Sequence, residues 1–430
     1  MHQIIHAHSV EGAINVPPSK SIMQRICAAA LLHEGKTIVS NVGESDDELA
    51  AIEIIKKLGA KVNSKVDGKI EIIGNPALEL CEDDIQEAIF LNCNESGLSL
   101  RMFTPIVATI PNVTMINGVG SLLKRPIGFF EELFPKLGVK IQSNQGNLPI
   151  TIKGPLMPID ISIDGSISSQ YLTGILFAFA HKTEKKVCIN VSNLKSTPYV
   201  DLTIDILNHF GYDVHNDNYK KFIVNPVNRS SQSTIEYEVE GDWSAASFML
   251  VAGAIAGSVE LHGLSLHSRQ ADKAILTALQ MAEVQMSITD KSISASKPFG
   301  NRKLKPFHFD ANHCPDLFPP LAVLAAYCDG ISVIEGVNRL TYKESNRAQS
   351  LKEVLGILGV KVELQEDSML IFGGSEIAGG KVHSCNDHRM AMACAVIALH
   401  AQMPVSIEDA DVVSKSYPRF YSDLESISVK

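Results

Sequence analysis

The sequence predicts an α/β protein of two domains, built from a repeated unit of a helix, a glycine and a strand. At 430 residues the chain is too long for one ordinary hydrophobic core. Apolar residues make up 45% of the chain and charged residues 20%, which is typical of globular proteins. The third observation is a short apolar pattern around a glycine, which recurs along the whole chain.

The recurring pattern places a glycine between an amphipathic stretch and an alternating stretch. Its copies are LGAKV at 58–62, LGVKI at 137–141, FGYDV at 210–214, a degenerate MAEVQM at 281–286, and LGVKV at 358–362. Glycine suits the left-handed conformation that ends a helix, and the alternation after it suits a strand. One or two copies would be an ordinary helix-to-strand transition. Their spacing of about 71 to 79 residues favours internal duplication, with about six units if a last copy has lost its glycine.

The domain boundary is expected in the polar stretch NRSSQST at 228–234, which follows the third copy. The formal charge of −10 argues against a nucleic-acid partner, although a local cluster of cations could still bind anionic substrates. No apolar run reaches the roughly 18 residues of a membrane span, and the N-terminus lacks a signal-peptide core. The eight cysteines are dispersed, so we expect buried thiols in the cytoplasm and neither zinc nor disulfides.

Polar blocks precede several apolar stretches that are predicted to be helices. In the first block, PPSKSIMQR at 17–25, a tight turn feeds a helix and presents Lys20, Ser21 and Arg25. Free backbone N–H groups and cations at a helix start form an anion site. By itself such a block is also explained as a helix cap.

Similar blocks recur along the chain: NESGLSLR at 94–101, KRPIG at 124–128, DGSISSQY at 164–171, EGDWSAA at 240–246, HCPD at 313–316, KESNR at 343–347, NDHRMAM at 386–392, and Lys415. Pro126 suits a helix start. Lys343 and Arg347 are four residues apart, which places both on one helix face beside Glu344. Charge runs are usually solvated surfaces, but repetition at helix starts favours a shared site.

Five of these segments resemble motifs of the 5-enolpyruvylshikimate-3-phosphate synthase family, in the family's order. PPSKSIMQR resembles its P-G-S-K-S-x-S-N-R, and DGSISSQYLTG its D-G-S-x-S-S-Q-F-L-T. YKESNR, CNDHRMAMA and KSYPRFY resemble its later motifs. The resemblance implies a two-domain inverse α/β barrel-like fold of six βαβαββ repeats, three per domain. It also implies that the chain crosses between domains twice, giving domains of 17–235 and of 1–16 plus 236–430, with the active site in the interdomain cleft.

The resemblance further implies transfer of the enolpyruvyl group of phosphoenolpyruvate to the 5-hydroxyl of shikimate 3-phosphate, without metal or organic cofactor. The implied ligands of shikimate 3-phosphate are Lys20, Ser21, Arg25, Ser168, Ser169, Gln170, Ser196, Asp316 and Lys343. Those of phosphoenolpyruvate are Lys20, Gly97, Arg125, Gln170, Arg347, Arg389 and Lys415. Two carboxylates in different environments can divide proton transfer.

Asp316 is the candidate base for the hydroxyl, Glu344 the candidate for exchanging the C3 proton, and Lys20 a further catalytic candidate. A simple salt bridge to its neighbours is the alternative role of Glu344. We expect a cytoplasmic monomer in the shikimate pathway of aromatic amino-acid biosynthesis, with domain closure on its ligands and no nucleic-acid or membrane partner.

Two other functions are weighed. The related enolpyruvyl transferase acting on UDP-N-acetylglucosamine has a reactive cysteine before its counterpart of Arg125, and residues 114–125 contain none. A non-catalytic relative is disfavoured because Asp316, Glu344 and the cations are kept. The chain departs from the usual family residues at three places. It has Pro18 where the family usually has glycine, Asn94-Glu95 where it has Gly-Asn, and Leu98 where it has threonine. We expect the Glu95 carboxylate to turn away from the substrate and pair with Arg101 or Arg125.

Overall fold

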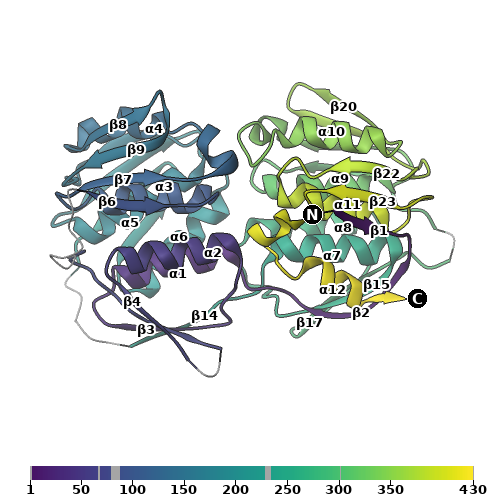
Figure 1. The fold of residues 1–430 in the computed structure, drawn as a ribbon, viewed down its shortest axis with the longest axis horizontal. Coiled ribbons are helices and arrows are strands. Elements are labelled where there is room, and N and C mark those ends of the chain that lie inside the picture. The colour runs from purple at the N-terminus through teal and green to yellow at the C-terminus, as the bar shows by residue number, and fades with distance from the viewer. Residues whose placement is uncertain (1, 66–67, 79–87, 228–233, 301, 430) are drawn as a thin grey trace. The chain divides into compact units, whose positions relative to one another are not determined.

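The computed structural model in Figure 1 describes residues 2–65, 68–78, 88–227, 234–300 and 302–429. It divides into two compact units, the first Pro18–Val239 and the second Met1–Pro17 with Glu240–Lys430. The boundary expected at 228–234 falls mostly on 228–233, which lie outside the described residues. The chain therefore passes between units after Pro17 and after Val239.

Within its described residues, the first unit forms three four-stranded sheets. In sheet order their strands are β14 (Ile235–Glu238), β3 (Lys36–Ser40), β5 (Ile70–Ile73) and β4 (Lys61–Ser64); β6 (Ile89–Asn92), β7 (Val113–Asn117), β9 (Asn147–Lys153) and β8 (Lys140–Asn144); and β10 (Ile161–Asp164), β11 (Val187–Ser192), β13 (Lys221–Asn225) and β12 (Asp213–Asp217). The first pair in each sheet is parallel and the others are antiparallel. The helices are α1 (Lys20–Leu31), α2 (Asp46–Lys57), α3 (Gly97–Val107), α4 (Gly128–Leu133), α5 (Ser169–Lys182) and α6 (Thr197–His209), with 3₁₀ helices η2 (Gly120–Lys124) and η3 (Phe134–Leu137).

The second unit, in the parts that are described, has sheets of five, four and three strands. In sheet order they are β16 (Gln285–Ile288), β17 (Ser292–Ser296), β15 (Gly257–His262), β2 (Ser9–Asn15) and β24 (Ser428–Val429); β18 (His308–Asp310), β19 (Ile331–Glu335), β21 (Ser368–Phe372) and β20 (Lys361–Gln365); and β1 (His2–Ile5), β23 (Val405–Glu408) and β22 (Gly380–His383). The helices are α7 (Trp243–Ala256), α8 (Ile275–Met281), α9 (Phe318–Ala326), α10 (Arg347–Ile357), α11 (His388–Ala398) and α12 (Phe420–Ser426), with η4 (Ala271–Ala274), η5 (Pro315–Leu317), η6 (Val337–Leu340) and η7 (Ala410–Lys415).

Three of the six sheets of the described chain follow one repeating plan. Residues 89–153, 161–225 and 308–372 each run strand, helix, strand, helix, strand, strand. The other sheets take a strand from a distant part of the chain: β14 lies parallel to β3, β2 parallel to β15, and β1 antiparallel to β23. The expected fold class, an inverse α/β fold of βαβαββ repeats, is confirmed.

The glycine of the repeat performs the role predicted from the sequence. A left-handed conformation is found, with φ of 87°, 80°, 79° and 89°, at Gly59, Gly138, Gly211 and Gly359. In the degenerate copy Glu283 adopts it with φ of 58°. The last helix, α12, instead reaches β24 through Ile427 at φ −103°, so this copy needs no glycine. The local rule for ending a helix thus explains the repeat.

Each unit has central helices that are buried on nearly every side. All of α3 and all of α7 are buried, and α1 is buried from Ile22 to Leu31. Close packing of α3 and α5 requires Gly174, because a Cβ there would lie 2.3 Å from the carbonyl oxygen of Arg101. No helix among the described residues has both the length and the hydrophobicity to cross a bilayer.

Candidate active site

The polar blocks lie at the N-terminal turns of helices, as the sequence predicted. Ser168 caps α5, and its hydroxyl accepts a 3.3 Å hydrogen bond from the Gln170 N–H. Asp387 caps α11 in the same way, accepting from the Arg389 N–H at 3.0 Å. Such turns carry the positive end of the helix dipole, which favours anions.

Two expectations about these helix starts are wrong. Lys343 and Glu344 do not share a helix face with Arg347, because α10 begins only at Arg347. The Asn346 side chain accepts from the Gln349 N–H at 3.4 Å and caps the helix there, which leaves Lys343 and Glu344 outside it. Similarly, α4 begins at Gly128 rather than at Pro126.

In the first unit, α1 presents two predicted cations with different surroundings. Lys20 pairs with Asp47 at 2.9 Å, a partner that no local pattern in the sequence indicates. Arg25 donates from Nε to the Thr203 hydroxyl at 2.9 Å and from Nη1 to the Ser21 carbonyl at 2.7 Å. Burial lowers the pKa of Arg25 to about 10, and within the described chain the guanidinium has no carboxylate partner. A buried cation without a counterion is costly, which favours an anionic ligand beside it.

A second buried guanidinium, Arg101 on α3, was not among the predicted site residues. It is 5% exposed, and its Nη1 donates to Gln170 Oε1 at 2.8 Å. Its Nε has no hydrogen-bond partner, and no carboxylate of the described residues pairs with it. A Cβ at Gly97 would lie 2.5 Å from Arg125 Nη1 and 2.9 Å from Arg101 Nη1. Two guanidinium groups therefore converge on Gly97, and a larger residue there would have to displace them.

Of the two partners expected for the Glu95 carboxylate, Arg101 or Arg125, Arg101 does not pair with it among the described residues. The Glu95 carboxylate instead accepts hydrogen bonds of 2.9 Å from both the N–H and the hydroxyl of Ser121.

Hydrogen bonds between helices gather the starts of α1, α3, α5 and α6 in the first unit. Gln24 Oε1 on α1 accepts from the hydroxyls of Ser96 and Ser99 at 2.8 and 3.0 Å. The hydroxyls of Thr173 on α5 and Thr203 on α6 lie 3.0 Å apart. The predicted ligands on these starts are Lys20, Ser21, Arg25, Gly97, Ser168, Ser169, Gln170 and Ser196. The structure thus brings this set together within one unit.

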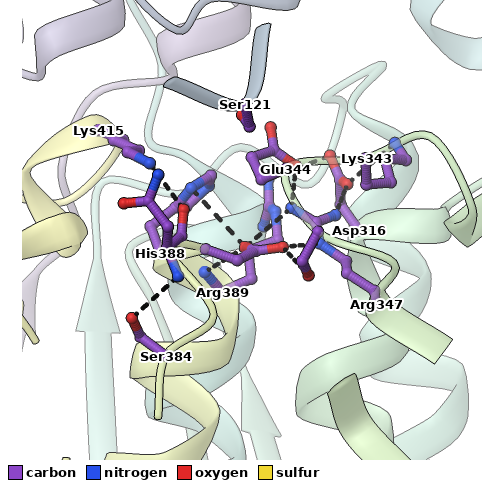
Figure 2. A network of polar contacts seen from close by, with 12 residues as sticks. Ser121, Asp316, Lys343, Glu344, Arg347, Ser384, His388, Arg389 and Lys415 are labelled. Atoms are coloured by element: carbon purple, nitrogen blue, oxygen red, sulfur yellow. Dashed lines mark hydrogen bonds and ion pairs between the residues drawn. The ribbon is translucent and has the colours of Figure 1, made fainter. Parts of the chain in front are cut away.

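In the second unit, the predicted base Asp316 lies among predicted anion-binding cations, as Figure 2 shows. Its Oδ1 accepts from Lys343 Nζ at 3.2 Å and from Arg347 Nη1 at 2.6 Å. Its Oδ2 accepts from Arg389 Nη2 at 3.1 Å. Burial alone would raise the pKa of Asp316, but these cations, Arg389 first, hold it well below its usual range. Asp316 is therefore ionised at neutral pH.

Arg347 is fully buried and connects the carboxylates of this site. It donates from Nε and Nη2 to Asp387 at 2.7 and 3.2 Å, a forked pair, and from Nη2 to Glu344 at 2.5 Å. Burial would lower the pKa of Arg347, but the carboxylates, Asp387 first, raise it well above its ordinary value. Asp387 was given no role from the sequence, although it stands inside the NDHRM block.

The remaining predicted cation, Lys415 at the end of η7, donates to the Asn386 carbonyl at 2.7 Å and so joins the start of α11. Behind these groups lies the fully buried Asp272 of η4, which no local pattern predicted. Its Oδ2 accepts from the Ser244 hydroxyl, while its Oδ1 has no hydrogen-bond partner among the described residues. Burial, together with the charge of Asp316, raises the pKa of Asp272 to about 6.

The site residues of the first unit and those of the second unit can perform complementary chemistry. Cations at helix starts can bind phosphate and carboxylate groups, and Asp316 and Glu344 can exchange protons. No cluster of three or more histidine, cysteine, aspartate or glutamate side chains suited to a metal occurs in the described part of the chain.

Comparisons with known proteins agree with this chemistry. The family model for EPSP synthase (3-phosphoshikimate 1-carboxyvinyltransferase) matches residues 5–424. Curated 3-phosphoshikimate 1-carboxyvinyltransferases from Clostridium novyi and Clostridium acetobutylicum are 33% and 35% identical to this chain, and each alignment covers 97% of it and 95% of the relative.

Solved structures resemble the fold over its full length. EPSP synthase from Acinetobacter baumannii superposes with a TM-score of 0.79 at 25% identity, covering 100% of this chain and 98% of that one. The enolpyruvyl transferase NikO from Streptomyces tendae, at 16% identity, shares the fold with a TM-score of 0.77 over 99% of this chain and 97% of its own. The chain belongs to the EPSP synthase family.

Proposed function

We propose that this chain transfers the enolpyruvyl group of phosphoenolpyruvate to the 5-hydroxyl of shikimate 3-phosphate and releases phosphate. The proposal places it in the shikimate pathway of aromatic amino-acid biosynthesis. The observation that carries it is the position of Asp316, whose carboxylate touches Lys343, Arg347 and Arg389. A proton acceptor and anion-binding groups are thereby held in one cluster, as an addition to phosphoenolpyruvate requires.

The binding roles are divided between the two units. In the first unit, Arg25 supplies a buried charge for the phosphate of shikimate 3-phosphate, assisted by the hydroxyls at the starts of α1, α5 and α6. Arg125, beside Gly97, supplies charge for phosphoenolpyruvate. In the second unit, Arg347, Arg389 and Lys415 hold phosphoenolpyruvate. Both units are then needed for turnover.

Electrostatics explains how the binding of phosphoenolpyruvate makes Asp316 a stronger base. In the free protein the cations hold its pKa low, so that it is a weak base. When the phosphate and carboxylate of phosphoenolpyruvate neutralise Arg347 and Arg389, the pKa of Asp316 rises and the carboxylate can accept a proton. The base is therefore activated by the substrate that it serves.

The proton balance follows from two carboxylates. Asp316 accepts the hydroxyl proton as the oxygen bonds to C2, and protonated Glu344 gives its proton to C3, which produces a tetrahedral adduct. Glu344 is held in the cluster because its carboxylate accepts a hydrogen bond from Arg347 at 2.5 Å. In the elimination, Glu344 takes the C3 proton back as the C2–O bond to phosphate breaks, and the proton on Asp316 passes to the departing phosphate. This regenerates the double bond on the product and returns both carboxyl groups to their starting forms.

The test measures phosphate release from phosphoenolpyruvate with either shikimate 3-phosphate or UDP-N-acetylglucosamine as acceptor. We expect release only with shikimate 3-phosphate. Equal turnover with UDP-N-acetylglucosamine would overturn the assignment of the acceptor, and binding of both ligands without turnover would indicate a non-catalytic relative.

We also propose that the units close on their ligands, because each unit carries part of the cation set. Solution scattering should show a smaller radius of gyration when shikimate 3-phosphate and a phosphoenolpyruvate mimic are both added. On the pattern of the sequence we further propose a cytoplasmic monomer without nucleic-acid or membrane partners. Sedimentation and cell fractionation test these last points.

A further inference from the structure

Glu95 and Ser121 connect two loops that lie 26 residues apart in the sequence. Glu95 stands in the turn before α3, and Ser121 is the second residue of η2. The Glu95 carboxylate accepts from the Ser121 N–H and from the Ser121 hydroxyl, each at 2.9 Å. The Glu95 carboxylate thereby accepts from both the backbone N–H and the side-chain hydroxyl of one residue in the 3₁₀ turn.

Main-chain contacts show that the two loops are built to fit one another. Cys93 N–H donates to the Asn117 carbonyl at 2.9 Å, and Val119 N–H to the Asn94 carbonyl at 2.8 Å. Gly120 has φ of 56°, and a Cβ there would lie 2.4 Å from Cδ of Glu95. The glycine therefore leaves space for the carboxylate to lie against the backbone of η2.

The two connected loops carry the groups that converge on the first unit's anion site. Gly97 follows Glu95 by two residues and begins α3. Arg125 follows directly after η2, and its N–H donates to the Leu122 carbonyl at 3.1 Å. The Arg125 guanidinium reaches the position that a side chain at Gly97 would occupy. A shift of η2 relative to α3 would therefore move Arg125 away from Gly97.

We propose that Glu95 is a positioning residue, which holds the Arg125 turn against the Gly97 turn and so sets the affinity for phosphoenolpyruvate. The inference rests on the proposed function, because it takes Arg125 and Gly97 as ligands of that substrate. It also explains how a carboxylate occurs close to an anion site. Glu95 hydrogen-bonds to Ser121 and contributes through the geometry of the loop.

The experiment compares Glu95→Gln, Glu95→Ala, Ser121→Ala and the Glu95→Ala/Ser121→Ala double variant by steady-state kinetics. Glu95→Ala should raise the KM for phosphoenolpyruvate about tenfold or more and leave the KM for shikimate 3-phosphate within about twofold. Glu95→Gln keeps an oxygen that can accept from Ser121, so it should stay within about threefold of wild type. Ser121→Ala should have a smaller effect than Glu95→Ala and add little to it in the double variant.

A matched control is available in the same unit. Glu131, an exposed residue of α4, accepts a hydrogen bond from the Ser143 hydroxyl. Both residues are well separated from Gly97 in the sequence. Glu131→Ala removes the same kind of pair, and we expect both KM values to stay unchanged.

A second readout does not depend on turnover. The Ser121 amide should exchange with solvent faster in Glu95→Ala than in wild type and Glu95→Gln.

If wild type shows no acceptor-dependent phosphate release, the proposed function fails, while amide exchange still tests the connection between the loops. An active Glu95→Ala with faster exchange but an unchanged KM for phosphoenolpyruvate would overturn the positioning role. A tenfold fall of that KM in Glu95→Gln would also overturn it, by showing that the charge opposes the substrate. If Glu95→Ala does not fold, Glu95→Gln and Ser121→Ala carry the test.

Discussion

Asp316 Oδ1 accepts a hydrogen bond of 2.6 Å from Nη1 of Arg347, so the proposed base is bound to a proposed substrate ligand. The same guanidinium also holds Asp387 and Glu344. In the free protein these carboxylates occupy the donors that a phosphate or carboxylate of the substrate would use. Binding must therefore rearrange the hydrogen bonds of Arg347, which couples substrate binding to the proton affinity of Asp316.

The first prediction concerns Asp316→Asn. It removes the proton acceptor, so kcat should fall about 10²–10⁴-fold. It also removes a charge that competes for the cations, so the KM for phosphoenolpyruvate should not rise. Steady-state kinetics with both substrates measures this, with exposed Asp310→Asn as the control for charge loss nearby. A variant that keeps its kcat and loses only affinity would show that Asp316 positions substrate without accepting a proton.

The second prediction separates the two roles considered for Glu344. In Glu344→Gln the amide can still accept from Arg347, so phosphoenolpyruvate should still bind. Exchange of solvent deuterium into the C3 methylene should be lost, and kcat should fall about 10²-fold or more. Mass spectrometry of recovered phosphoenolpyruvate measures the exchange. If Glu344→Gln exchanges deuterium into C3 as wild type does, the role of Glu344 is limited to its salt bridge with Arg347.

The third prediction concerns Arg25→Lys. Lysine keeps a charge but not the planar fork, and it has a single nitrogen in place of the two, Nε and Nη1, with which Arg25 reaches Thr203 and Ser21. The KM for shikimate 3-phosphate should rise about tenfold or more, and that for phosphoenolpyruvate should change much less. The control is Arg302→Lys, an exposed arginine of the second unit. Equal increases in both KM values would point to general damage rather than to a phosphate ligand.

The fourth prediction uses the buried Asp272, whose pKa is raised from 3.8 to about 6. Between those values the folded protein binds more protons than the unfolded chain, so its free energy of unfolding falls as pH rises. Above pH 6 the full penalty of about 3 kcal/mol remains, since each pKa unit corresponds to about 1.4 kcal/mol. Asp272→Asn should remove this penalty.

Urea unfolding at pH 4, 5, 6 and 7 measures the effect. Asp272→Asn should differ little from wild type at pH 4 and be more stable at pH 7, by up to about 3 kcal/mol. Asp290→Asn, an exposed aspartate between β16 and β17, should show no such trend. A stability difference that does not grow with pH would contradict a raised pKa at Asp272.

The fifth prediction compares two glycines in helices. A Cβ at Gly174 would lie 2.3 Å from a backbone oxygen of α3, which cannot rotate away. Gly174→Ala should therefore destabilise the protein by about 1–3 kcal/mol or more. Apart from its chain neighbours and the backbone of α10, no atom of the described residues lies within 4 Å of the Cβ position of Gly356, so Gly356→Ala should stabilise by about 0.5–1 kcal/mol. Thermal unfolding of both variants tests whether close approach of α3 and α5 is the reason for Gly174.

The sequence by itself determined the features that depend on neighbouring residues. The helix, glycine and strand repeat could be predicted because a left-handed glycine ends a helix through bonds to its own last turn. Helix starts could be predicted because serine, aspartate and asparagine satisfy N–H groups two or three residues away. The prediction that Lys343 lies in a helix was wrong. The residue that marks the true helix start, Asn346, was present in the sequence as a possible cap.

Only the tertiary structure decided the features that join distant segments. Arg25 meets Thr203 178 residues away, and Lys20 meets Asp47 27 residues away. The strands β14, β2 and β1 complete sheets whose other strands belong to remote repeats. The buried charges of Arg101 and Asp272 arise in the same way, because burial and counterions depend on which helices pack together. Sequence spacing determines which side chains share a turn, whereas packing determines which charges meet and which remain without a partner.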